Sequence, residues 1–197
     1  MDIQGAAFDS EDPETWGYTQ AERRVWGVAV HGGRVYYTVG NEAEVWSVGI
    51  DRDGGFAGDP RWELTVDAEE DDAVTDIAFD NRGFMYLAQR GKTDNRYDYS
   101  QFADSGKGEV LRYWRESPDD PATESVWVEV PETYAVGFPD GHRQSAGGID
   151  LQYGYDAQGN FNRNACADTL VKTGDRLRDN PTLAEQLAAG GPAAVHG

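Results

Sequence analysis

Apolar and polar residues alternate along several short stretches of the chain, and turn-forming residues separate these stretches. The first group begins at Val25 and runs VWGVAVHGG, RVYYTVG, AEVWSVGID and WELTVDA. Alternation with a period of two, with many valine and aromatic residues, predicts half-buried β-strands, and Gly-Gly predicts a tight turn. We therefore expect four short strands in this first unit.

The same order of elements recurs later in the chain. The second unit contains VTDIAFD, the turn NRG, FMYLAQRG, GEVLRYWRES from Gly108 and SVWVEVP from Ser125. A third unit begins with SAGGIDLQYGYDAQGNF, and CADTLVKTG is its candidate third strand. Four strands per unit, recurring after roughly 50 to 70 residues, are typical of β-propeller blades. The alignment of the first two units pairs Val28 with Ile77, Val30 with Phe79, Tyr36 with Met85 or Tyr86, Val45 with Val110, and Trp62 with Trp127.

The segment IAFDNRGFMYLA, from Ile77 to Ala88, resembles the blade opening of NHL-repeat and gluconolactonase-like β-propellers. The resemblance covers about residues 25–174 and implies an all-β fold of four-stranded blades, with two full blades and part of a third on this chain. There are two departures from the pattern. His31-Gly32-Gly33 replaces the Asp turn in the first unit, and the third unit has no clean strand after YGYDAQGNFNRN.

Closed propellers need at least four blades. Three explanations remain open: the chain is a fragment of a longer protein, several copies close a ring, or the unit count is different. We favour the fragment. An open row of blades leaves unpaired edge strands, so self-association through these edges is a further expectation.

The two ends of the chain differ from the blade region, which we place at residues 23–178. Residues 1–22 lack periodicity and are expected to form a flexible arm. In NPTLAEQLAAGG, Asn180 is a candidate N-cap and Pro181 a first helical residue, so a short helix is expected within residues 179–197, followed by the start of a truncated strand.

The charge of the chain limits its partners. The formal net charge is -19, from 36 acidic and 17 basic residues, so nucleic acids and anionic membranes would be repelled. No apolar run is long enough for membrane insertion. We expect a protein or small-molecule ligand, or a metal cation. The single Cys166 excludes an intrachain disulfide and a cysteine-based metal cluster. A fragment of a secreted protein would be extracellular or periplasmic.

The resemblance also implies a metal ion on the propeller axis, held by acidic and amide side chains at the blade openings. By position Asp76 is the best match in this sequence and Asp150 a weaker one, with calcium as the expected cation. The alternative is a solvated acidic loop. DRDGG, from Asp51, superficially resembles the start of a calcium-binding loop, but loop position twelve is Trp62 rather than Glu. A strand-connecting turn is therefore expected there.

Two irregular stretches are candidates for ligand binding. The insertion from Lys92 to Gly108 is longer than most connections between strands, and long loops on a rigid scaffold often carry function. An ordinary loop excursion is the alternative. The stretch from Tyr134 to Ser145 could lie beside the insertion. The predicted ligand-binding residues are Asp94, Asn95, Tyr97, Asp98, Tyr99 and Asp104 in the insertion, and His142 and Arg143 in the second stretch.

No catalytic motif stands out: G-x-S-x-G, G-x-x-x-x-G-K-[ST], H-E-x-x-H and G-x-G-x-x-G after a strand are all absent. We therefore expect a non-catalytic binding or interaction module. The alternatives are a calcium-dependent hydrolase resembling lactonases, with Asp76 as one ligand, and a structural part of an extracellular assembly.

Overall fold

The computed structural model describes residues 23–40, 43–67, 72–91, 106–117, 126–131, 134–138, 140–152, 158, 160 and 169–177. Within these residues the fold is all-β, as expected, with one 3-10 turn and no α-helix. The predicted arm and the predicted C-terminal helix lie outside the described residues. The elements are β1 (Val25–His31), β2 (Arg34–Val39), β3 (Glu44–Gly49), β4 (Arg61–Thr65), β5 (Ala73–Phe79), β6 (Met85–Arg90), β7 (Val110–Ser117), β8 (Val126–Glu129), the turn η4 (Asp140–His142), β9 (Ser145–Gln152) and β10 (Thr169–Gly174).

The first sheet is an antiparallel meander in the order β1-β2-β3-β4, as the alternation predicts. Its first hairpin pairs His31 with Arg34, which leaves only Gly32 and Gly33 in the turn. Both glycines have positive φ, 55° and 79°. A two-residue hairpin of the type I′ class requires positive φ at both central positions, and glycine adopts it without steric cost. This turn chemistry explains why the first unit can dispense with an aspartate.

The second sheet contains a meander of the same kind, β5-β6-β7-β8, in which β5 pairs with β6. The antiparallel pair β9–β10 joins this sheet through a single residue pair, Arg90 with Ala146. Because β10 pairs directly with β9, the prediction that CADTLVKTG is the third strand of its unit was wrong; Thr169–Gly174 is the second. Alternation identifies a strand, but it does not say which strand becomes its neighbour when the connection is long.

Asp80 closes the hairpin between β5 and β6. Its Oδ1 accepts hydrogen bonds from the backbone amides of Arg82 (2.8 Å) and Phe84 (2.9 Å), and the Tyr86 hydroxyl donates to Oδ2 (3.3 Å). Aspartate is favoured in such turns because its short side chain satisfies nearby amides. The Asp-x-x-Gly-x-apolar-Tyr motif therefore forms a hairpin whose turn is stabilised by the side chain of its own aspartate.

The DRDGG segment folds in the same way. Oδ1 of Asp51 accepts the amides of Asp53 (2.9 Å) and Gly55 (2.7 Å), and Gly54 has a φ of 83°. The expectation of a strand-connecting turn is confirmed.

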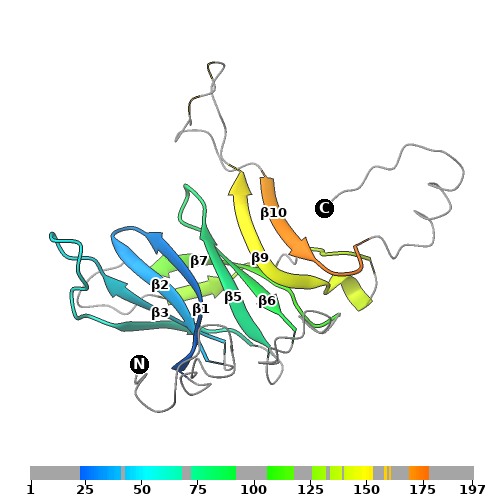
Figure 1. The fold of residues 1–197 in the computed structure, drawn as a ribbon, viewed down its shortest axis with the longest axis horizontal. Helices are drawn as coiled ribbons and strands as arrows, with labels where there is room; N and C mark the ends of the chain where they lie inside the picture. Colours follow the sequence, from blue (N-terminus) through cyan, green and yellow to red (C-terminus); the bar gives the residue numbers. More distant parts are fainter. Residues whose placement is uncertain are drawn as a thin grey trace, which may run out of the picture.

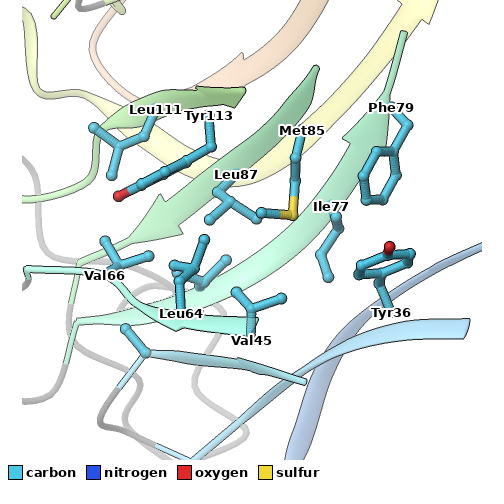
Figure 2. Packing of buried hydrophobic residues seen from close by; sticks show 12 residues of the cluster. Tyr36, Val45, Leu64, Val66, Ile77, Phe79, Met85, Leu87, Leu111 and Tyr113 are labelled. Carbon is cyan, nitrogen blue, oxygen red and sulfur yellow. The ribbon is translucent and has the colours of Figure 1, made fainter. Parts of the chain in front are cut away.

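The two sheets and the β9–β10 pair are stacked in a row, with β1 against β5 and β5 against β9 (Figure 1). Figure 2 shows how side chains of the first sheet, such as Tyr36 and Leu64, point toward side chains of the second, such as Ile77 and Met85. A second cluster joins the opposite face of the second sheet to β9 and β10. The first cluster comprises Tyr36, Ala43, Val45, Leu64, Val66, Val74, Ile77, Phe79, Met85, Leu87, Leu111 and Tyr113.

Strand pairing fixes the equivalence of the two meanders. Val30 lies opposite Val35 as Phe79 lies opposite Met85, and Ala29 lies opposite Tyr36 as Ala78 lies opposite Tyr86. Tyr36 therefore corresponds to Tyr86, one of the two partners that the alignment left open, and the matches of Val28, Val30 and Val45 are confirmed.

The match of Trp62 with Trp127 was wrong. Trp62 lies opposite Trp46, a residue of β3 that itself pairs with β2. Trp127 lies opposite Arg115, beyond the residues of β7 that pair with β6. The fourth strands therefore pair at different positions along the third strands, and both pairings contain a register shift.

A buried polar chain crosses the contact between the two sheets. Arg34 donates from Nε to Ser47 Oγ (2.8 Å), and Ser47 donates in turn to Glu63. The other oxygen of Glu63 accepts from Nε1 of Trp127 at 2.8 Å. Glu63 is only 2% exposed, so both of its oxygens need partners. At the outer end of the chain, Arg34 forms an ion pair with Asp59 (2.7 Å).

Candidate functional site

A cleft of about 470 Å³ opens where β1, β5 and β9 come together. Its polar side chains come from three segments of the chain that are distant in sequence. The walls are formed by Ala29, Val30 and His31 of β1, by residues 76–81 of β5 and its turn, and by Ile149 and Asp150 of β9.

Asp76 connects two of these strands. Its Oδ1 accepts the amide of Ile77 and its Oδ2 accepts the amide of Ile149 on β9, both at 2.9 Å. Next to it the hydroxyl of Thr75 donates to the carbonyl of Gly147 at 2.8 Å. Both oxygens of Asp76 therefore hold backbone amides, which makes this carboxylate a link between β5 and β9.

Asp76 also lies against β1. A Cβ added to Gly27 would lie 3.0 Å from the Cα of Asp76, so only glycine permits this close approach of the strands. Gly27 and Asp76 hold equivalent positions in their strands, which explains why the first unit carries no carboxylate there.

Asp150 is the exposed carboxylate of the cleft. Its Oδ1 accepts the amide of Leu151 at 2.8 Å, and Oδ2 makes no hydrogen bond within the described part of the chain. The carboxylate of Asp80 is already satisfied by its turn. Of the three carboxylates that line the cleft, Asp150 is thus the one best able to meet a ligand.

His31 forms part of the β1 side of the cleft. Its ring stacks on Phe79, with centroids 4.4 Å apart and planes 8° from parallel. Burial and the nearby positive charge of Arg115 lower the pKa of His31, while Asp80 acts in the opposite direction. His31 is therefore neutral at pH 7.

The structure brings the two predicted metal ligands, Asp76 and Asp150, to the same cleft. Among the described residues, however, no group of three or more His, Cys, Asp or Glu side chains could hold a metal ion. Two carboxylates that already accept amides provide few of the six to eight oxygen ligands that calcium takes.

The other predicted ligand-binding residues are not in this cleft. His142 and Arg143 precede β9, about 23 Å from Asp150 along an extended strand. The Nδ1 of His142 lies 2.7 Å from the Gly137 carbonyl, and Arg143 pairs with Glu109 at 2.9 Å. Asp94, Asn95, Tyr97, Asp98, Tyr99 and Asp104 lie outside the described residues.

Three polar residues of the cleft were missed as site candidates: His31, Asp80 and Asn81. A signal for them was present in the sequence, because all three lie at the end of the first strand of a unit, in or beside its turn. Whether such a hairpin end lies next to another strand depends on how the sheets stack. The alternation of apolar and polar residues gives no information about this stacking.

Comparison with known proteins identifies no relative: no protein-family model, no curated protein and no solved structure matches this chain. Within the described residues, no helix has the length and apolar character needed to cross a membrane.

Proposed function

We propose that this protein is a non-catalytic binding module built on propeller-type blades, and that the cleft between β1, β5 and β9 receives a cationic ligand. The observation that carries the proposal is the convergence of Asp76, Asp80 and Asp150 on one opening, with Asp150 exposed.

The blade assignment is supported by the repetition of one meander in two sheets with matching strand registers. It is also supported by the row formed by β1, β5 and β9, the first strands of the three units. First strands that lie side by side are what blades around a common axis would produce.

The ligand class follows from charge. The cleft carries three carboxylates on a chain of net charge -19, so it attracts cations and repels anions. Asp150 offers Oδ2 to a metal ion or an ammonium group, and the ring of His31, stacked on Phe79, lines the β1 side of the cleft. Calcium and a primary amine are the simplest representatives of the two kinds of cation.

The alternative of a calcium-dependent hydrolase resembling lactonases would use the same cleft. It would need further ligands beyond Asp76 and Asp150, and Asp76 would have to bind a metal while holding two amides. A binding role does not require these further metal ligands, and for this reason we favour it.

Thermal melting with added calcium chloride, added butylamine or EDTA tests the proposal. A ligand selective for the folded state raises its stability, by about 2.7 kcal/mol at 100 times the dissociation constant. We expect one of the two cations to raise the midpoint in the wild type, and Asp150→Asn to remove the increase. Asp53→Asn, in an exposed turn, should keep it. Coincident melting curves under all three conditions would contradict the proposal.

A further inference from the structure

The outer face of the first sheet carries a row of aromatic side chains. Tyr37 of β2 lies opposite Trp46 of β3, and Trp46 lies opposite Trp62 of β4. Residues that lie opposite each other on adjacent strands share one face of a sheet. Val28 of β1 extends the row beyond Tyr37 and is 58% exposed, and Trp62 at the other end is 47% exposed. The row therefore crosses all four strands, and both of its ends are open to solvent.

The second sheet has aliphatic side chains at the positions equivalent to this row. These side chains are at most 5% exposed and pack against the first sheet (Figure 2). The residues equivalent to Val28, Tyr37 and Trp46 are, in this order, Ile77, Leu87 and Leu111. Tyrosine and tryptophan instead combine a large apolar ring with a polar group, which favours surfaces that meet apolar groups and water together. The open face is therefore built differently from the face that another sheet covers.

The two indole rings of the row are held by side chains of their own strands. Nε1 of Trp46 donates to Oε2 of Glu44 at 2.9 Å, and Nε1 of Trp62 donates to Oγ1 of Thr65 at 3.3 Å. These hydrogen bonds limit the rotation of both rings before a ligand binds, which lowers the entropy cost of binding. Since both N–H groups already have acceptors, the rings offer a ligand their flat faces rather than hydrogen-bond donors.

An apolar hollow of about 440 Å³ lies beside the aromatic row. Tyr37 belongs to both the row and the lining of the hollow, and Phe56 in the lining is 71% exposed. The rest of the lining consists of Val25, Val28, Val35, Val48 and Pro60. Because adjacent strands are about 4.8 Å apart, the Cα atoms from Tyr37 to Trp62 span about 10 Å. The row and the hollow thus form one continuous surface, with room for more than one ring of a ligand.

The polar groups on this face indicate the class of ligand. Among the described strand residues that the pairing places on this face, Glu44 is the only charged one. Its Oε1 makes no hydrogen bond within the described part of the chain and can accept one from a hydroxyl group. A proline-rich segment offers mainly acceptors and needs donors, which the two indoles already use. Nucleic acids and acidic polysaccharides are repelled by the net charge of -19.

We propose that the outer face of the first sheet binds a neutral polysaccharide with extended, β-linked sugar rings. The C–H groups on the flat side of such a ring carry slight positive charge, so they stack on the negative face of an aromatic ring. Hydroxyl groups at the edge of the sugar donate to Glu44. A straight row across a sheet fits an extended chain of sugar rings better than a helical one. The proposal is independent of the ligand in the cleft.

Isothermal titration calorimetry of the whole chain with cellohexaose and with N-acetylchitohexaose tests the proposal. We expect at least one of the two to bind the wild type. Trp46→Leu, which introduces the residue of the covered sheet, should weaken binding by about 10-fold or more, because leucine offers no flat face. Trp62→Ala should have a similar effect, whereas Trp62→Phe retains a ring and should lose less. Trp114→Ala, at a 41% exposed tryptophan of β7, is the matched control and should bind as the wild type does.

Far-UV circular dichroism verifies that the variants are folded, and Trp62→Phe against Trp62→Ala keeps the test valid if Trp46→Leu does not fold. No binding of either oligosaccharide to the wild type, or unchanged binding in the folded row variants, would overturn the proposal. Binding of decaproline in place of the oligosaccharides would assign the face to a proline-rich protein and overturn it as well. Asp150→Asn should leave oligosaccharide binding unchanged, and a loss there would place the sugar in the cleft instead.

Discussion

The meanders β1–β4 and β5–β8 have the same strand order and, over their first three strands, the same register of apolar positions. Described elements nevertheless cover the outer face of the second meander and not that of the first. Val28 and Ile77 occupy equivalent positions, and their exposed fractions are 58% and 4%. The difference lies only in the neighbour: Ile77 packs against Tyr36 and its surroundings in the first sheet, whereas nothing in the described residues packs on Val28.

This comparison teaches that alternation determines which side of a strand is apolar, but not whether that side is buried. Burial depends on the next layer. An apolar face that no other sheet covers contributes little to the free energy of unfolding. Substitutions at equivalent positions of the two sheets can test this difference in contribution.

The largest expected effect on stability is at Ile77, the buried residue of the equivalent pair Val28 and Ile77. Ile77→Ala should lower the free energy of unfolding by about 2–5 kcal/mol, because it leaves a cavity between two packed sheets. Val28→Ala should change it by less than about 0.5 kcal/mol, because Val28 is largely exposed. Urea unfolding of both variants measures the difference, and equal losses would show that the two faces are not packed differently.

An intermediate effect is expected at Trp127, which joins β8 to the first sheet. Trp127→Phe keeps an aromatic ring, although a smaller one, and removes the indole N–H that donates to Glu63, which leaves a buried carboxylate oxygen without this partner. The expected loss is about 1–3 kcal/mol. Trp114→Phe, at an exposed tryptophan of β7, serves as the control and should cost less than about 0.5 kcal/mol. A similar loss in both variants would place the cost in the aromatic ring itself.

The smallest expected effect is the pH dependence contributed by His31. Its pKa in the folded protein lies below the ordinary value of 6.5, so the unfolded chain binds a proton that the folded protein does not. The stability contributed by neutral His31 is fully present above pH 6.5 and is lost as the pH falls through the folded pKa. Unfolding measured at pH 7.5 and at pH 5 should show a drop in the wild type that is smaller in His31→Gln. An identical drop in both would assign the pH dependence to other groups.

Part of the candidate site could be predicted from the sequence. Asp76 and Asp150 were selected by their positions at the start of strand units, and both line the cleft. The role of Asp76 as a link to the Ile149 amide could not be predicted, because that bond joins residues 73 positions apart. His142 and Arg143 were selected because they lie in an irregular stretch that could lie beside the insertion from Lys92 to Gly108. The structure places them before β9, away from the cleft, and Arg143 donates to the carbonyl of Lys107 at the end of that insertion.

The sequence by itself determined the local structure of this protein. Period-two alternation defined the strands, and short-range turn chemistry at Gly32-Gly33, Asp51 and Asp80 determined where the strands reverse, since these interactions lie within a few residues. Only the tertiary structure decided that β10 pairs with β9, that Gly27 lies against Asp76, and that no element of the described part of the chain covers the outer face of the first sheet. The physical reason is that each of these depends on the stacking of layers from distant parts of the chain, which local patterns do not specify.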